Sequence, residues 1–153
     1  MENASEKIVI VACKRTPIGQ YLGCFAEMSA PQLGAEVIKA LFTTLPVETK
    51  EVDEVIMGCV LSAGIGQAPA RQAAIGADLP FSVPATTLNK MCGSGMKAIM
   101  VAYDSLLAGS QRIIVAGGME SMSNAPYLLT KARSGYRMGH GTMYDHMFLD
   151  GMF

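Results

Sequence analysis

The sequence predicts an α/β fold in which helices cover a mixed sheet, with elements in the order β-α-β-α-β-α-β. Short continuous runs of β-branched and other apolar residues recur along the chain, and such runs are typical of strands buried on both faces. Segments with apolar residues at helical spacing lie between these runs, as they do in layered α/β domains. The chain has 153 residues, half of them apolar, which is enough for one such domain.

The first half of this pattern is a predicted strand–helix–strand unit. Residues 7–12, which contain four consecutive β-branched side chains, form the first expected strand. A helix is expected after Ser29, which can cap it, with Pro31 in the first turn and Gln32 completing a capping box. A second buried strand is expected over residues 52–60. Two strands joined through a helix predict a parallel pair with a right-handed crossover.

The second half of the pattern contains two more strands and two helices. Pro69 can open a short helix, and a third strand is expected over residues 83–88, where Pro84 must lie near the start or on an edge. The next helix ends before Gly109, which suits the position after a helix end, and the fourth strand covers residues 112–116. The apolar stripe of that helix comprises Met96, Ile99, Met100, Tyr103, Leu106 and Leu107.

The composition changes after the fourth strand. Residues 1–118 carry the α/β pattern and are expected to form one domain. From residue 119 onward, Ser, Asn, Gly, Met, Tyr and His replace the β-branched residues, and no strong periodicity remains. A segment of this composition has too little apolar patterning to fold alone. Residues 119–153 are therefore expected to be an excursion from a larger protein or a segment that docks on a partner.

Charge and cysteine content exclude several classes of protein. Twelve Lys and Arg residues oppose thirteen Asp and Glu residues, and a net charge of −1 provides no electrostatic footprint for nucleic acid. The longest apolar runs are far shorter than the roughly 20 residues of a membrane span. The cysteines form no C-x-x-C pair for zinc or redox chemistry. We therefore expect reduced thiols, no metal site and a cytoplasmic protein.

Cys92 is the strongest candidate for a catalytic residue. It lies between the third expected strand and the following helix, with Gly93 and Gly95 beside it. Ligands of open α/β sheets bind outside the carboxyl ends of the strands, and the positive end of a helix dipole stabilises a thiolate. Backbone N–H groups around Cys92 could also bind a developing oxyanion. The alternative for Cys92 is a buried structural cysteine in a glycine-rich turn. Cys13, at the end of the first expected strand, and Cys59, inside the second, are interpreted as small core residues.

Four segments of the chain, taken in order, resemble motifs of one enzyme family. They are residues 15–19 (R-T-P-I-G), 66–73 (G-Q-A-P-A-R-Q-A), 89–95 (N-K-M-C-G-S-G) and 114–123 (I-V-A-G-G-M-E-S-M-S). All four resemble segments of the thiolases, the acyl-CoA C-acyltransferases, and the third resembles the signature around the thiolase nucleophile. By this resemblance the chain is identified as the N-terminal half of a thiolase.

The resemblance implies a mechanism and an assembly. Cys92 would be the nucleophile, whose thiolate attacks an acyl-CoA and becomes an S-acyl enzyme, with its backbone N–H in the oxyanion hole. Claisen condensation of acetyl-CoA to acetoacetyl-CoA, or the reverse thiolysis of a 3-ketoacyl-CoA, would follow, as in fatty acid metabolism. Coenzyme A would enter as a substrate, and no tightly bound cofactor is implied. Thiolases are dimers or tetramers of a layered protomer with two similar halves and a loop domain that covers coenzyme A.

Part of the thiolase pattern is absent from the sequence. The segments N-E-A-F, G-H-P and C-x-G, which supply the catalytic histidine and a second cysteine, do not occur, and residues 119–153 resemble only the start of the loop domain. We therefore expect a partner that supplies the C-terminal half, and a hetero-oligomer that is active only with it. His140 and His146 match no catalytic histidine and are interpreted as solvent or interface residues.

Two alternatives remain open. One is a related condensing enzyme of the ketoacyl synthase type, which shares the fold and the cysteine, although residues 114–123 favour a thiolase. The other is a non-catalytic scaffold or fragment that pairs with a thiolase-like partner. The complete motif around Cys92 favours the enzyme over the scaffold.

Overall fold

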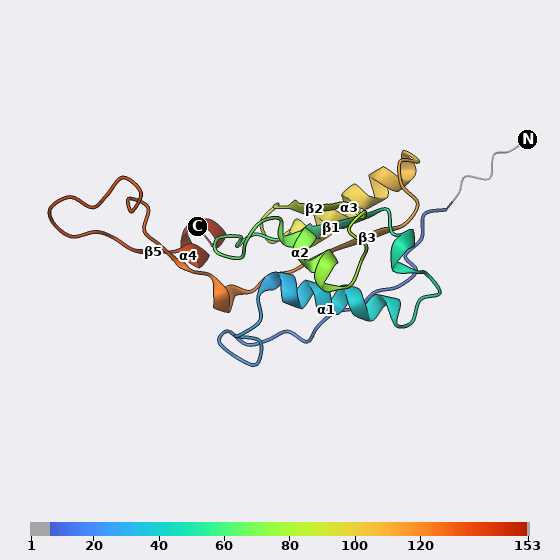
Figure 1. Cartoon of the computed structure of the whole chain (residues 1–153), viewed down its shortest axis with the longest axis horizontal. Helices are drawn as coiled ribbons and strands as arrows, with labels where there is room; N and C mark the ends of the chain where they lie inside the picture. Colours follow the sequence, from blue (N-terminus) through green and yellow to red (C-terminus); the bar gives the residue numbers. More distant parts are fainter. Residues whose placement is uncertain (1–6, 153) are drawn as a thin grey trace, which may run out of the picture.

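The structure is a computed structural model that describes residues 7–152 and is built around a parallel sheet (Figure 1). The strands are β1 (Glu54–Gly58), β2 (Ala85–Leu88) and β3 (Ile114–Gly118), in the order β2-β1-β3. β1 pairs in parallel with both neighbours, and helices join the consecutive strands. The α/β fold class and the alternation predicted for residues 52–118 are therefore confirmed.

Helices cover the sheet on both faces. α1 (Ala30–Phe42) and α2 (Pro69–Gly76) lie on one face, and α3 (Ser94–Leu107) lies on the other (Figure 1). Successive side chains of a strand point to opposite faces. In β1, Val55 accordingly joins a core with α1 and α2, whereas Ile56 packs against α3. The carboxyl ends of all three strands are left at one edge of this three-layer arrangement.

Local sequence signals place several element ends as predicted. The Ser29 side chain accepts the N–H of Gln32, and the Gln32 side chain accepts the N–H of Ser29, which completes the capping box of α1. Pro84 directly precedes β2, which is an edge strand of the described sheet. Gly109 follows α3 with a φ of +71°, a left-handed conformation that glycine adopts without strain.

The first predicted strand is wrong. Residues 7–12 form no strand and pair with none of the strands in the described chain. Val9, Ile10 and Val11 are 66%, 81% and 69% exposed, because no described element covers them. A β-branched run favours an extended backbone, but a strand also needs a neighbouring strand to pair with. The described residues place no such strand beside this run. The first predicted strand–helix–strand unit therefore does not form, and Cys13 is exposed and not a core residue.

The apolar stripe of α3 faces away from the sheet. The side that packs on the sheet carries the small residues Ala98 and Ala102, which allow the helix to lie close to β1 and β3. The large side chains point outward and are 49% to 71% exposed; they are Met96, Ile99, Met100, Tyr103 and Leu107. A contiguous exposed apolar surface of this kind marks a site of interaction.

Residues 119–152 contain only short elements. β4 (Tyr127–Leu128) and β5 (Tyr144–Asp145) form an antiparallel ribbon, and α4 (His146–Gly151) follows it. The loop between β4 and β5 is exposed throughout and extends away from the sheet (Figure 1). Two short 3-10 helices lie at Thr49–Glu51 and Met122–Asn124. Among the helices of the described residues, none has the length and apolar character needed to span a bilayer.

Candidate functional site

Cys92 lies in the turn between β2 and α3, at the carboxyl edge of the sheet. The Ser94 hydroxyl donates to the carbonyl of Met91 at 2.6 Å and accepts the N–H of Lys90 at 2.8 Å. The side-chain oxygen of Asn89 accepts the N–H of Met91 at 2.9 Å. These bonds hold Met91 at a φ of +50°, which is unfavourable for a side chain of this size. The turn is therefore a fixed structure that presents Cys92, and Cys92 is exposed.

Glycines bring the start of α3 against the ends of two strands. A Cβ added at Gly58 would lie 2.6 Å from both the Cβ and the carbonyl carbon of Ser94. A Cβ added at Gly118 would lie 3.1 Å from the Cα of Gly95. Because glycine has no Cβ, the helix start can touch β1 and β3 at these points. This close approach determines how near Cys92 lies to the carboxyl ends of both strands.

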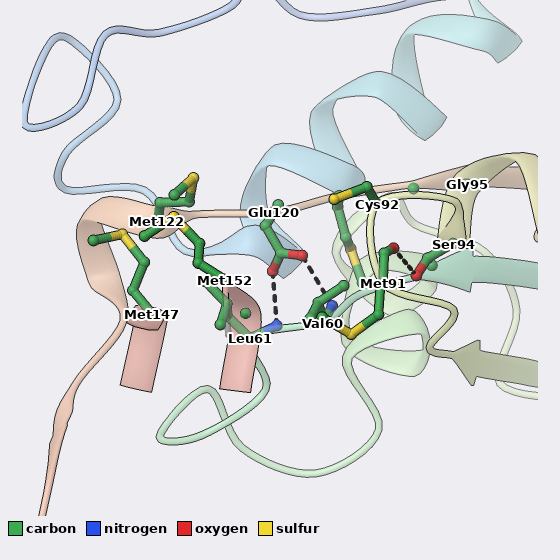
Figure 2. A pocket seen from close by; sticks show the side chains of 14 residues that line it. Val60, Leu61, Met91, Cys92, Ser94, Gly95, Glu120, Met122, Met147 and Met152 are labelled. Atoms are coloured by element: carbon green, nitrogen blue, oxygen red, sulfur yellow. Dashed lines mark hydrogen bonds between the residues drawn. The ribbon is translucent and has the colours of Figure 1, made fainter. Parts of the chain in front are cut away.

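A pocket of about 530 Å³ opens beside Cys92 (Figure 2). In Figure 2, Met147 and Met152 lie on one side of it, Cys92 and Met91 lie on the other, and Glu120 lies between them. The wall is largely apolar and contains five methionines, namely Met91, Met119, Met122, Met147 and Met152. Concave sites with apolar walls and few polar groups are typical ligand sites, and methionine adapts its shape to what it contacts.

Glu120 holds the segment that follows β1. Its carboxylate oxygens accept the backbone N–H groups of Val60 at 2.9 Å and Leu61 at 3.0 Å, as the dashed lines of Figure 2 show. The Cys59 sulfur lies 3.7 Å from the same carboxylate. Burial raises the pKa of the Cys59 thiol to about 12, and the charge and hydrogen bond of Glu120 add to the rise. Cys59 is therefore a protonated core thiol at neutral pH, as its place in the second strand predicts.

The cysteines differ sharply in their surroundings. Cys92 is exposed and lines the pocket. Cys59 is buried, and Cys13 and Cys24 are exposed but are not among the residues that line this pocket. Among the cysteines of the chain, all of which the structure describes, Cys92 is the one that combines exposure with a place on the pocket wall. It is the thiol that an entering ligand would meet.

His146 is buried, with 5% of its surface exposed, so its interpretation as a solvent or interface residue is wrong. The Ala63 N–H donates to its Nε2 at 3.3 Å, and its Nδ1 lies 2.7 Å from the Asp150 carboxylate. Because Nε2 accepts a backbone N–H, the ring proton is placed on Nδ1, where it donates to Asp150. The sequence signal is a His and an Asp four residues apart, which lie on one face of a helical turn. His140 is exposed, as predicted.

Comparison with known proteins identifies the family. The family described as "Thiolase, N-terminal domain" matches residues 8–153 of this chain. The chain belongs to the thiolase family. An acetyl-CoA acetyltransferase of Cupriavidus necator is 52% identical over 146 residues, which are 95% of this chain and 37% of the length of that enzyme.

Similar relatives occur in other organisms. Acetyl-CoA acetyltransferase 1 of Arabidopsis thaliana is 49% identical over 95% of this chain and 35% of its own length. A probable acetyl-CoA acyltransferase of Staphylococcus epidermidis is 49% identical over 95% of this chain and 37% of its own length. The chain therefore spans little more than a third of the length of these relatives.

Two of the four thiolase-like segments of the sequence contribute residues to the wall of the pocket. Residues 89–95 form the Cys92 turn, and residues 114–123 bring Gly118 and Glu120 to the wall. A third segment has a structural role, because Arg71 of α2 donates to the carbonyls of Val83 and Phe81. Two separate motifs of this domain thus lie around one pocket, and a third fixes the backbone that precedes β2.

Proposed function

We propose that this chain is the N-terminal part of an acyl-CoA C-acyltransferase and that Cys92 is its nucleophile. The observation that carries the proposal is the place of Cys92, an exposed thiol on the wall of an apolar pocket at the start of α3. The names of the relatives, which are acetyl-CoA acetyltransferases, support acyl-CoA as the substrate class. Residues 1–118 would form the nucleophile domain, and residues 119–153 would begin the domain that covers coenzyme A.

The proposed reaction has two transfers. In the first, the Cys92 thiolate attacks the carbonyl carbon of an acyl-CoA, the carbon–sulfur bond to coenzyme A breaks, and coenzyme A leaves with a proton. The acyl group is then a thioester on Cys92, and backbone N–H groups of the turn, that of Cys92 included, would stabilise the oxyanion. In the second, the α-carbon of acetyl-CoA gives up a proton and attacks the thioester. This releases the thiolate and a 3-ketoacyl-CoA, which is acetoacetyl-CoA when the acyl group is acetyl. Thiolysis is the reverse.

The base that activates Cys92 and the group that moves the α-proton would come from a C-terminal half. The outward face of α3 supports such a partner, because five large apolar side chains there are at least 49% exposed in the described chain. Further assembly into dimers or tetramers, a place in fatty acid metabolism and a cytoplasmic location belong to the same proposal. No tightly bound cofactor enters it, since coenzyme A is consumed and released.

The test is the site of the acyl group. The complete enzyme, in which this chain is joined or bound to its C-terminal half, is incubated with acetoacetyl-CoA and examined by intact-mass and peptide mass spectrometry. We expect an acetyl adduct on Cys92 and a loss of acyl transfer of more than about 1,000-fold in Cys92→Ala. Cys24→Ala, at an exposed cysteine that does not line the pocket, is the matched control and should retain both.

Three other results would point elsewhere. An adduct on another residue, or transfer that persists in Cys92→Ala, would remove Cys92 from its role. A requirement for an acyl-carrier protein in place of coenzyme A would indicate a ketoacyl synthase. A chain that binds its partner but takes no acyl group, with Cys92 alkylated no faster than an ordinary thiol, would be a scaffold.

A further inference from the structure

We propose that His146 is a positioning residue that latches α4 to the loop after β1 and so fixes the wall of the pocket at Cys92. The latch consists of the His146 ring, the Ala63 N–H and the Asp150 carboxylate. The nature of the ligand, an acyl group, rests on the proposed function above. The latch itself rests only on the geometry of the described residues.

The His146 ring joins two parts of the chain that are far apart in sequence. Its Nε2 accepts the N–H of Ala63, which lies in the loop after β1, at 3.3 Å. Its Nδ1–H donates to Asp150, one turn further along α4, at 2.7 Å. The Asp150 bond fixes the proton on Nδ1 and thereby keeps Nε2 free to accept. One side chain therefore orients itself on its own helix and holds the neighbouring loop.

The same helix forms part of the pocket wall. Met147, Gly151 and Met152 all line the pocket, and Figure 2 shows both methionines on the side away from Cys92. Gly151 packs tightly on the loop, because a Cβ added there would lie 3.0 Å from the Leu61 Cδ2 atom. The position of α4 against the loop therefore sets the size of the pocket.

A helix of this length cannot hold that position by itself. α4 has six residues, and isolated helices of fewer than about 12 residues are marginal in water. Its place depends on tertiary contacts, among which the partly buried His146–Ala63 bond is a directional one. Without that bond, α4 is held less firmly against the loop, and the pocket widens on the side opposite Cys92. Longer acyl groups would then be accepted more readily.

Two amide variants separate the two bonds of the ring. His146→Gln places an amide oxygen near the position of Nε2, so it can accept from Ala63. His146→Asn places its amide near the position of Nδ1, so it can reach Asp150 but not Ala63. The variants are made in the complete enzyme, and His140→Asn, at an exposed histidine, is the control. The first readout is hydrogen exchange of the Ala63 amide at a single pH, which needs no activity.

We expect the protection of the Ala63 amide to fall about five- to tenfold in His146→Asn and to stay within about twofold in His146→Gln. The second readout is the ratio of kcat/KM for acetoacetyl-CoA to that for 3-ketohexanoyl-CoA. This ratio should fall about three- to tenfold in His146→Asn and be restored in His146→Gln. Restoration by Gln distinguishes a positioning bond from simple filling of space.

Equal behaviour of the Gln and Asn variants would overturn the latch. Asp150→Ala provides a second test at a half-exposed site, where a folding defect is not expected. Removal of the carboxylate frees the ring proton from Nδ1 and should lower the protection of the Ala63 amide. Unchanged protection in Asp150→Ala would also overturn the latch. If the wild type transfers no acyl group, the proposed function fails, and the exchange measurements still decide the latch.

Discussion

Glu120→Gln is expected to loosen the segment after β1 and to make Cys59 more reactive. In the native structure the Glu120 carboxylate accepts the N–H groups of Val60 and Leu61 and lies beside the Cys59 sulfur. A glutamine keeps one oxygen acceptor and replaces the other with an NH2 donor. One of the two backbone N–H groups therefore faces a donor, and the negative charge beside Cys59 disappears.

The sizes of the two effects can be estimated separately. A hydrogen bond to a charged acceptor contributes roughly 1.5–3 kcal/mol, so the loss of one should lower the free energy of unfolding by about 2 kcal/mol. With the pKa of Cys59 near 12, roughly one thiol in a thousand is ionised at pH 9. Burial remains in the variant, so the pKa of Cys59 falls but stays above that of an ordinary thiol.

The assay is alkylation of Cys59 in a Cys92→Ala background. Iodoacetamide modification is followed by peptide mass spectrometry between pH 8 and 10, and stability is measured by urea unfolding. In Glu120→Gln, iodoacetamide should modify Cys59 faster at every pH in this range than in the parent protein, and the urea midpoint should be lower. Glu36→Gln is the control, because Glu36 is an exposed residue of α1.

Unchanged alkylation together with an unchanged urea midpoint would refute this reasoning. That outcome would mean that the carboxylate neither holds the backbone of the segment nor acts on the thiol. A lower midpoint with unchanged alkylation would support the role of Glu120 in holding the backbone and refute its electrostatic effect on Cys59. The measurement thus tests the two roles of Glu120 independently.

Three further predictions concern other parts of the structure. Asp53→Asn removes a carboxylate whose pKa is lowered by hydrogen bonds from backbone N–H groups just before β3, first that of Ile113 and then that of Arg112. The stability that this carboxylate contributes is therefore present above about pH 4 and is lost as pH falls through the pKa of the folded state. Urea midpoints of variant and wild type should differ at pH 7 and converge toward pH 3. Gly58→Ala should destabilise by about 1–3 kcal/mol and slow acyl transfer, whereas Gly117→Ala, with its nearest contact at 3.5 Å, should be milder in urea unfolding and activity assays. Ile99→Glu should leave the α3–sheet core intact and abolish binding of the C-terminal half in native mass spectrometry; binding at wild-type strength would exclude this face as the interface.

The helices were predictable because their signals act over a few residues. The Ser29 capping box and Gly109 each specify a backbone conformation that neighbouring residues satisfy. The strand expected at residues 7–12 failed for the opposite reason. Its sequence favours extended backbone, but a strand is completed only by a partner, and the local sequence does not identify one. The stripe on α3 was visible in the sequence, yet the sequence did not show which side of the helix faces the sheet.

The candidate site was predictable at the nucleophile and not across the pocket. The glycines on either side of Ser94, next to Cys92, indicated a sharp turn between strand and helix, and the structure has that turn. The opposite wall comes from a region without periodicity, so nothing in the sequence linked Met147 and Met152 to Cys92. Only the path of the chain through β4 and β5 returns α4 to the loop after β1.

The first part of the loop after β1 is held by the segment that follows β3, whereas Gln72 of α2 holds the last part through the carbonyls of Ile65 and Gln67. Glu120 binds its first part at Val60 and Leu61, and His146 binds it again at Ala63. Both holding residues belong to the segment that follows β3, so this segment is part of the pocket and not an appendage to it. Cys92, by contrast, is fixed by bonds within its own turn, which include those of Ser94. Substitutions in α4 should therefore change which acyl group fits without changing the geometry of the nucleophile, because separate sets of contacts hold the two walls.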